Sequence, residues 1–281
     1  MLRLVPLYVI IFLGIILLVL LYVPDTAPLS IYTTSQYGLS NLYTILQNVT
    51  NVHVCIGHCQ EAAFGNTSMF ILIFSDFSNV LDTFREITNH GGVIILAPCA
   101  PVKSLGIVQL HLSQHQGSII ALTRFLPGAS VQIPELGHVL PIVNASKVEL
   151  CNAKPFAYAM SMLIIRKRNG TSIMLKNIPV VAYCKMDRST VMILPTCYTL
   201  INMLVHDDSP NARLFRKLVH YLHVEHVYII YDKELVKNDF ILVERLRIEK
   251  YLNNIRYVIT LVLIPLVIIY LMYLVYSFIR R

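Results

Sequence analysis

The chain carries an uncharged apolar stretch at each end, over residues 4–23 and 257–279, and no comparable run lies between them. A helix rises about 1.5 Å per residue, so each stretch is long enough to cross the ~30 Å hydrocarbon layer of a bilayer. We therefore expect one membrane-spanning helix at each end. No other feature constrains the fold as strongly, because the domain between the stretches is then attached to a membrane through both of its ends.

A cleaved signal peptide is the alternative for the first stretch, because Arg3 supplies a short basic start. The apolar region of a signal peptide has only ~7 to 15 residues and ends at a cleavage site with small residues. This stretch instead runs on through Val23 into a Pro-Asp-Thr-Ala-Pro sequence. An uncleaved signal anchor fits better. The second stretch contains Pro265, which transmembrane helices tolerate.

The basic residues that flank the two stretches give opposite indications of orientation. Arg3 precedes the first stretch and no Lys or Arg follows it until Arg85, which favours a cytoplasmic N-terminus. Two arginines follow the second stretch, but four basic residues precede it: Arg245, Arg247, Lys250 and Arg256. Because the first helix usually dominates, we expect a two-pass protein of the cell membrane with both termini in the cytoplasm and an extracytoplasmic central domain.

Sequons and cysteines agree with this orientation. Four Asn-x-Ser/Thr sequons lie between the stretches, and their modification requires translocation; they are Asn48, Asn66, Asn144 and Asn169. The six cysteines also lie there, an even number that allows three disulfides: Cys55, Cys59, Cys99, Cys151, Cys184 and Cys197. Burial as an unpaired apolar residue is an equal alternative for any one of them.

Charge and hydrophobicity indicate which kinds of partner the chain can have. The hydrophobic content of 56% is inflated by the two stretches, yet the middle of the chain keeps enough apolar residues to form a globular core. A net charge of +7 raises the question of nucleic acid, but the basic residues are scattered apart from short clusters at 166–168, 213–217 and 245–256. An anionic lipid surface explains the last cluster more simply. We expect the lipid bilayer and membrane proteins as partners, and no nucleic acid.

Hydrophobic periodicity predicts an α/β domain. Strands over 29–32, 51–56, 69–74 and 93–97 alternate with helices over 38–47 and 80–88, which is typical of a parallel sheet. The middle third predicts an inserted β-rich part, with strands over 107–112, 119–123, 161–166, 172–175, 179–183 and 190–194. Ser209-Pro210 is typical of a helix start, and a strand over 227–231 and a charged helix over 238–254 follow.

These patterns divide the chain into four parts. We expect a transmembrane signal anchor over residues 1–24 and an extracytoplasmic α/β domain over 25–237. A juxtamembrane helix over 238–256 and a transmembrane helix with a basic tail over 257–281 complete the chain.

Several segments together resemble a known family. They include Gly38-Leu39-Ser40, the strand that ends in Phe74-Ser75-Asp76, the double glycine Gly91-Gly92, Asn211-Ala212 at a helix start, and Tyr231-Asp232-Lys233-Glu234 before the terminal stretch. The pattern is similar to the membrane-anchored family catalogued as domain of unknown function 4350. The resemblance implies a flavodoxin-like sheet akin to class I glutamine amidotransferases, without an established activity. It also implies a place in an envelope-associated assembly, because members tend to be encoded beside MoxR-type ATPases.

The amidotransferase kinship raises a catalytic hypothesis. Amidotransferases use a Cys nucleophile on a turn between a strand and a helix, with His and Glu nearby. Cys99 and Cys197 each follow a predicted strand, and His223 and Glu225 form a His-x-Glu pair. Such a turn needs glycines around the nucleophile, whereas prolines flank Cys99 and no Gly-x-Cys-x-Gly sequence occurs. This favours a protein that is not an enzyme.

Two groups of residues are candidate ligands for zinc or copper. His53, Cys55, His58 and Cys59 lie within seven residues, and a second group comprises His206, His220, His223 and His226. The alternative for the first group is a half-buried strand with a Cys55 to Cys59 disulfide or with disulfides to other cysteines, and for the second it is the solvated side of a helix. Neither group has the spacing of a two-by-two zinc site, and no phosphate-binding glycine loop occurs, so we expect no metal or cofactor.

The carboxyl ends of the predicted parallel strands are the expected place for a ligand. Candidate ligand-binding residues at that edge are Ser35, Gln36, Ser75, Asp76 and Pro98. The sequence as a whole predicts a membrane-tethered extracytoplasmic interaction or scaffold protein. The alternative is an extracytoplasmic domain that binds a small ligand or acts as an amidotransferase-like or hydrolase-like enzyme.

Overall fold

A computed structural model describes residues 25–59, 64–100, 107–111, 139–143, 151–158, 163–166, 172–175, 179–207 and 209–258. The chain forms two compact units, one over Pro24–Asp239 and the other from Met1–Val23 together with Phe240–Arg281. The predicted spans lie outside the described residues, except where the second begins at Tyr257 and Val258. None of the described helices combines the length and apolarity needed to cross a membrane.

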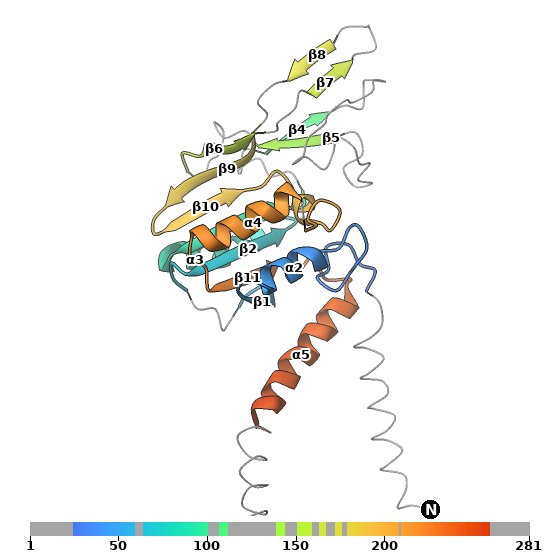
Figure 1. Ribbon diagram of the computed structural model, residues 1–281, viewed down its shortest axis with the longest axis vertical. Coiled ribbons are helices and arrows are strands. Elements are labelled where there is room, and N and C mark those ends of the chain that lie inside the picture. The colour runs from blue at the N-terminus through green and yellow to red at the C-terminus, as the bar shows by residue number, and fades with distance from the viewer. Residues whose placement is uncertain are drawn as a thin grey trace, which may run out of the picture. The chain divides into compact units, whose positions relative to one another are not determined.

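The Pro24–Asp239 unit contains a seven-stranded sheet in the order β1-β11-β2-β3-β10-β9-β6 (Figure 1). The first five strands in this order are parallel, and β9 and β6 run antiparallel to their neighbours. The predicted mixed α/β class with a parallel sheet is confirmed. The strand bounds are β1 (Asn51–Ile56), β2 (Ser68–Phe74), β3 (Gly92–Pro98), β6 (Lys154–Tyr158), β9 (Pro179–Met186), β10 (Ser189–Ile193) and β11 (His226–Tyr231).

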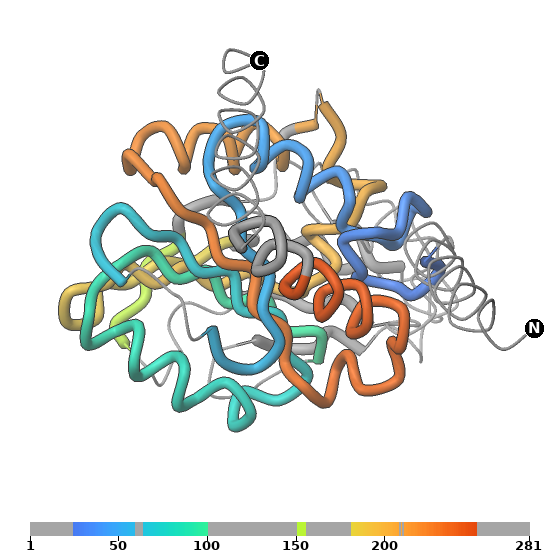
Figure 2. The backbone as a smooth tube through the Cα atoms, turned by 90° about the horizontal axis from the view of Figure 1, so that it is seen from below, coloured from blue at the N-terminus to red at the C-terminus, as the bar shows by residue number. Residues whose placement is uncertain are grey.

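The parallel sheet forms because its inner strands are continuous apolar runs. Every residue of β2 and β3 is buried, as expected for strands covered on both faces. Helices α2 (Ser40–Gln47) and α4 (Pro210–Tyr221) lie on one face, and α3 (Leu81–His90) lies on the other (Figure 2). Strand β1 lies at the edge of the sheet, and its residues are either exposed or only partly buried.

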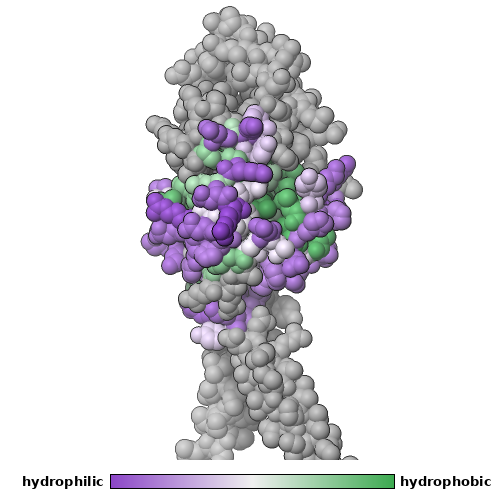
Figure 3. All heavy atoms as spheres, turned by 90° about the vertical axis from the view of Figure 1, so that its left-hand side faces the viewer, coloured by the Kyte–Doolittle hydropathy of each residue, from purple (hydrophilic) through white to green (hydrophobic). Residues whose placement is uncertain are grey.

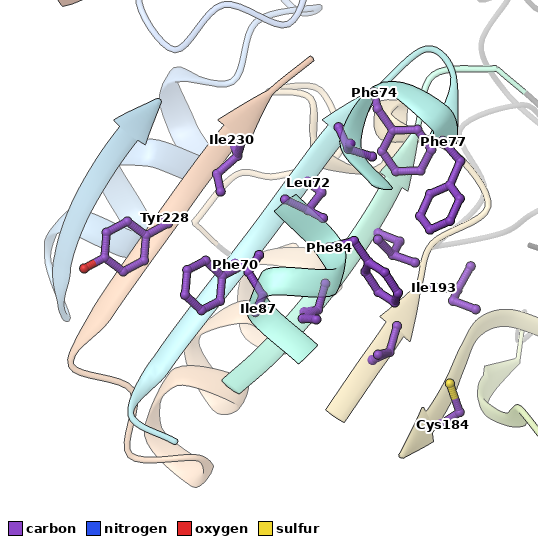
Figure 4. Close-up of a cluster of buried hydrophobic side chains, with 14 of the residues drawn as sticks. Phe70, Leu72, Phe74, Phe77, Phe84, Ile87, Cys184, Ile193, Tyr228 and Ile230 are labelled. Carbon is purple, nitrogen blue, oxygen red and sulfur yellow. The ribbon is translucent and has the colours of Figure 1, made fainter. Parts of the chain in front are cut away.

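An aromatic core fills the space between the sheet and α3. Phe70 and Tyr228 stack with ring centroids 5.1 Å apart, and Phe77 meets the edge of Phe84 at 5.4 Å (Figure 4). Such ring pairs stabilise a core beyond the effect of their buried area. The described surface in Figure 3 is mostly hydrophilic, with smaller hydrophobic areas between. The unit therefore has an apolar interior and a mostly polar surface, as a globular domain does.

Helices α4 and α3 begin in different ways. Ser209 caps α4 by accepting a hydrogen bond from Ala212 N at 3.1 Å, and Pro210 follows it, as predicted. Helix α3 has no side-chain cap of its own, because its N-cap residue is Val80. Asp76 instead accepts from Ser78 N and begins a short 3-10 helix, η2 (Phe77–Val80), which continues directly into α3.

The chain between β3 and β9 adds two small sheets. Strands β4 (Ile107–His111) and β5 (Val139–Val143) pair with each other, as do β7 (Leu163–Arg166) and β8 (Ser172–Leu175). The β-rich character of this part was predicted, but β5 and β6 were not. The strand predicted over 119–123 lies outside the described residues.

The strand predicted over 29–32 is wrong, because these residues form turns. Leu29 has a φ of +64°, which no strand residue adopts, and its N–H donates to Tyr37 O at 2.8 Å. The apolar side chains of Leu29 and Ile31 are buried, which explains why the run looked like a strand.

In the other compact unit, helix α5 (Phe240–Val258) contains an ion pair between Arg247 and Glu244 at 2.6 Å.

Candidate functional site

All six cysteines are paired, so the predicted disulfides are present. The pairs are Cys55–Cys59, Cys99–Cys197 and Cys151–Cys184, with Cα atoms 5.5, 4.9 and 6.2 Å apart. These separations are usual for disulfides. The second bond therefore joins the residue after β3 to the segment after β10, and the third joins the segment before β6 to β9.

The catalytic candidates do not form one site. Cys99 and Cys197 follow the carboxyl ends of β3 and β10 and are bonded to each other. A cysteine in a disulfide has no free thiolate to act as a nucleophile. His223 and Glu225 precede β11, at the amino ends of the parallel strands. A strand of six residues spans ~20 Å, so the length of the sheet separates the His-x-Glu pair from the cysteines. His223, at φ +50°, instead forms the turn after α4.

The metal-ligand candidates are also dispersed. Cys55 and Cys59 are bonded to each other, His53 stacks on Tyr228 at 4.9 Å, and His58 pairs with Glu86 at 3.3 Å. In the second group, His206, His220 and His223 are exposed. Among the described residues, no three His, Cys, Asp or Glu side chains converge as a metal ion requires.

The ligand candidates Ser35 and Gln36 belong to a loop that packs on the segment after β10. The Asn202 side chain donates to Thr33 O at 2.9 Å and to Ser35 O at 2.7 Å, while Gln36 O accepts from Met203 N at 3.1 Å. These backbone contacts give the two residues a structural role.

The other three candidates follow the ends of β2 and β3. Pro98 is buried at the end of β3, and Asp76 is exposed and caps η2. Ser75 contributes to a polar site, because its hydroxyl donates to Asp232 at 2.8 Å.

A polar pocket of about 530 Å³ lies at this edge of the sheet, and we refer to it as the carboxyl-edge pocket. Its walls come from the segments after β1 and β11 and from the beginning of α3. The lining residues are Gly57, His58, Asn79, Asp82, Thr83, Glu86, Asp232, Lys233 and Glu234. Its position agrees with the general rule for ligands of parallel sheets.

Asp232 organises the pocket. One carboxylate oxygen accepts hydrogen bonds from Asn79 Nδ2 at 2.9 Å and Ser75 Oγ at 2.8 Å, and the other accepts from Glu234 N at 3.0 Å. Burial alone would raise the pKa of Asp232, but the hydrogen bonds from the side chains of Asn79 and Ser75 and from the backbone of Glu234 and Ser75 together outweigh it and lower that pKa. The carboxylate is therefore ionised at neutral pH, and its charge is fixed at the pocket wall.

Both ends of the Pro24–Asp239 unit gather near the end of β11. The hydroxyl of Tyr231 donates to Leu29 O at 2.8 Å. Burial raises the pKa of this phenol, and the charges of Asp239 and Asp25 raise it further, so both carboxylates lie within electrostatic reach. Asp25 and Asp239 thus lie within electrostatic reach of the residue that ends β11.

The pocket lies at the edge of the sheet where the sequence predicts a ligand, but none of the five ligand candidates is among its lining residues. Asp232 follows a buried strand as Asp76 does, so the same rule could have found it. Gly57 and Lys233 gave no such signal, because only the insertion of β11 between β1 and β2 brings them together.

Two of the predicted glycosylation sites are described. Asn48 and Asn66 are both exposed, which leaves their amides accessible on the folded domain. Asn144 and Asn169 lie outside the described residues.

Comparison with known proteins finds no matching family model, no matching curated protein and no matching solved structure.

Proposed function

We propose that the protein is a membrane-tethered, extracytoplasmic interaction or scaffold domain with a flavodoxin-like sheet, related to the family catalogued as domain of unknown function 4350. The observation that carries the proposal is the pairing of all six cysteines. Disulfides persist in oxidising compartments and are rare in the cytosol. This supports the outward orientation that the N-terminal charge pattern favours.

The geometry of the chain ends supports tethering at two points. Asp25 and Asp239 both influence Tyr231 electrostatically, and in the sequence an apolar stretch lies beyond each end of the domain, over residues 4–23 and 257–279.

The arrangement of the catalytic candidates favours interaction over catalysis. Cys99 and Cys197 are bonded to each other, and His223 and Glu225 lie at the other end of the sheet. The partners that we propose are the lipid bilayer and other membrane proteins of an envelope assembly, including a MoxR-type ATPase system. The family resemblance is the support for the ATPase.

A cross-linking experiment on intact cells tests this function. The full-length chain and its His223→Ala variant are cross-linked with a membrane-impermeant reagent, purified and analysed by mass spectrometry. We expect the same extracytoplasmic membrane proteins with both chains, because His223 has no catalytic role. A chain that cross-links to no membrane protein contradicts the proposal, as does a variant that loses a cellular phenotype while keeping its cross-links.

A small-ligand-binding domain is the second candidate function. The carboxyl-edge pocket is the observation that favours it.

A further inference from the structure

One histidine from each group of candidate metal ligands lies in the same pair of strands. His53 is on β1 and His226 is on β11, and these strands are parallel neighbours at one edge of the sheet. Their register aligns Asn51 with His226 and His53 with Tyr228. Because side chains alternate between the two faces of a sheet, these four side chains project from the same face. The fold thus brings together two histidines that lie far apart in the sequence.

The two imidazole rings lie close enough to share a ligand. The ring centroids of His53 and His226 are 5.6 Å apart, and the ring planes are inclined by 33°. Imidazole nitrogens bind zinc at about 2.0–2.1 Å, so an ion held by one nitrogen of each ring places the two centroids on the order of 5 Å apart. The observed separation is therefore close to that of a chelating pair.

The Nδ1 atom of His226 gives an independent indication of a ligand. This nitrogen is buried, and it has no hydrogen-bond partner among the described residues. Buried polar atoms ordinarily have a partner, and an unsatisfied one costs free energy. Ring packing accounts for the position of His53, which stacks on Tyr228 at 4.9 Å, but it gives the His226 nitrogen no interaction. A bound metal ion would supply one.

Hydrogen bonds fix the backbone beside the two histidines. At the start of β1, Asn51 N donates to Glu225 O at 3.1 Å, and Thr50 Oγ1 donates to the same oxygen at 2.6 Å. On the side of β2, Glu225 N donates to Thr67 O at 2.8 Å. Two ligands on a rigid scaffold lose little entropy when they bind an ion.

The two histidines are also accessible from solvent. His53 is exposed and His226 is partly buried. Tyr228 is buried and stacks beside Phe70 in the core between the sheet and α3 (Figure 4). An ion therefore reaches the imidazoles from the outer side, while aromatic rings lie on the inner side.

The donor atoms select the class of ion. Imidazole suits zinc, copper and nickel, whereas magnesium and calcium prefer oxygen ligands. In the described part of the chain no three ligand side chains converge, so water molecules complete the coordination of an ion held by two imidazoles. Among these divalent ions, a site of given nitrogen ligands binds Cu²⁺ most tightly.

We propose that His53 and His226 together bind a divalent transition-metal ion, with Cu²⁺ bound more tightly than Zn²⁺. We refer to the two residues as the edge histidine pair. The proposal goes beyond the interaction function and does not depend on the membrane tether.

A competition titration tests the proposal on the full-length chain in detergent micelles. A chromogenic chelator competes for Cu²⁺ or Zn²⁺, and Mg²⁺ and Ca²⁺ serve as comparisons. We expect the chain to take Cu²⁺ from the chelator more readily than Zn²⁺ and to keep it in an excess of Mg²⁺ or Ca²⁺. A chain that binds neither probe, or that loses Cu²⁺ to Mg²⁺ or Ca²⁺, overturns the proposal.

His53→Phe and His90→Phe form a matched pair of variants, because each keeps an aromatic ring on its neighbour. His53 stacks on Tyr228, as described above. His90 stacks on Phe64, also at 4.9 Å, and its Nδ1 lies 2.8 Å from Glu86 O. Since even the loss of an outer partner of a metal ligand weakens binding about tenfold, we expect His53→Phe to weaken Cu²⁺ binding by at least that factor. His90→Phe is expected to leave it unchanged.

Equal Cu²⁺ affinity in His53→Phe and the unaltered chain overturns the assignment to this pair, as does an equal loss in His90→Phe. Electron paramagnetic resonance, at less than one Cu²⁺ per chain, then distinguishes chelation from contact with a single histidine. We expect coupling to two imidazole nitrogens in the unaltered chain and to one in His226→Gln. The same coupling in both chains contradicts a shared ion.

Discussion

Asp232 shows how a single side chain connects three elements at the carboxyl edge. Its carboxylate joins the segment after β11 to Ser75 after β2 and to Asn79 on η2. The sequence placed Ser75 correctly at this edge because an apolar run ends there. It gave no indication that Ser75 would contact Asp232, since 157 residues separate the two along the chain.

Replacing Asp232 with alanine leaves the donors of Ser75 and Asn79 without their acceptor. We expect the free energy of unfolding to fall by about 2–4 kcal/mol, because hydrogen bonds to a charged group are the stronger kind. Denaturant titration of the full-length chain in detergent measures the change. Asp187→Asn, whose side chain is exposed, serves as the control and is expected to change stability by less than about 0.5 kcal/mol.

The lowered pKa of Asp232 also makes a prediction about pH. A carboxyl group whose pKa is lowered by folding stabilises the protein fully above its unfolded pKa of about 4, and that contribution is lost as the pH falls through the folded pKa. Between about pH 5 and about pH 2, the Asp232→Asn variant is therefore expected to lose less stability than the unaltered chain. If the free energy of unfolding fell equally with pH in the two chains, folding would not stabilise the ionised form of this carboxyl group.

At the scale of elements, the parallel sheet was predictable and the loop before α2 was not. Strands β2, β3 and β11 are apolar runs of the length and composition that buried strands require. Residues 25–39 also contain buried apolar side chains, but long-range polar contacts determine their shape. The amide of Asn202 donates to Thr33 O, Ser35 O and Ser40 Oγ and accepts from Asn41 N.

Asn202→Ala removes these four hydrogen bonds from a buried position. We expect a loss of about 2–4 kcal/mol, because several backbone groups of the loop and of α2 then lack a partner. Thermal unfolding measures the loss, and Asn238→Ala, at an exposed position, is the matched control. A change no larger than that of the control would mean that the loop does not depend on this amide.

The disulfides stabilise their elements to different extents. Cys99–Cys197 closes a separation of 98 residues, whereas Cys55–Cys59 closes a separation of 4. Because a longer closed loop restricts the unfolded chain more, we expect the double serine variant at 99 and 197 to lose about 2–4 kcal/mol and the variant at 55 and 59 to lose less. Denaturant titration compares the two variants, and the reverse order would contradict the reasoning.

At the scale of the whole molecule, the sequence predicted the fold class, and its six cysteines allowed three disulfides without indicating which residues pair. It also predicted a ligand at the carboxyl edge, and that stays a prediction. It could not supply the pocket, because the order of strands in the sheet decides which segments become neighbours. Strand β11, near the end of the chain, lies between β1 and β2 and brings Asp232 and Lys233 beside Gly57. The catalytic hypothesis weakened for the same reason, since topology put the His-x-Glu pair and the cysteines at opposite ends of the strands.

The most direct test of the proposed function is surface labelling of intact cells. A membrane-impermeant amine reagent is applied, and the protein is then digested without reduction and mapped by mass spectrometry. We expect label on Lys185 and Lys217, which are exposed on the Pro24–Asp239 unit, together with a linked peptide that contains Cys99 and Cys197. Label that reaches these lysines only after the cells are lysed, with the two cysteines recovered as free thiols, would contradict an extracytoplasmic, disulfide-bonded domain.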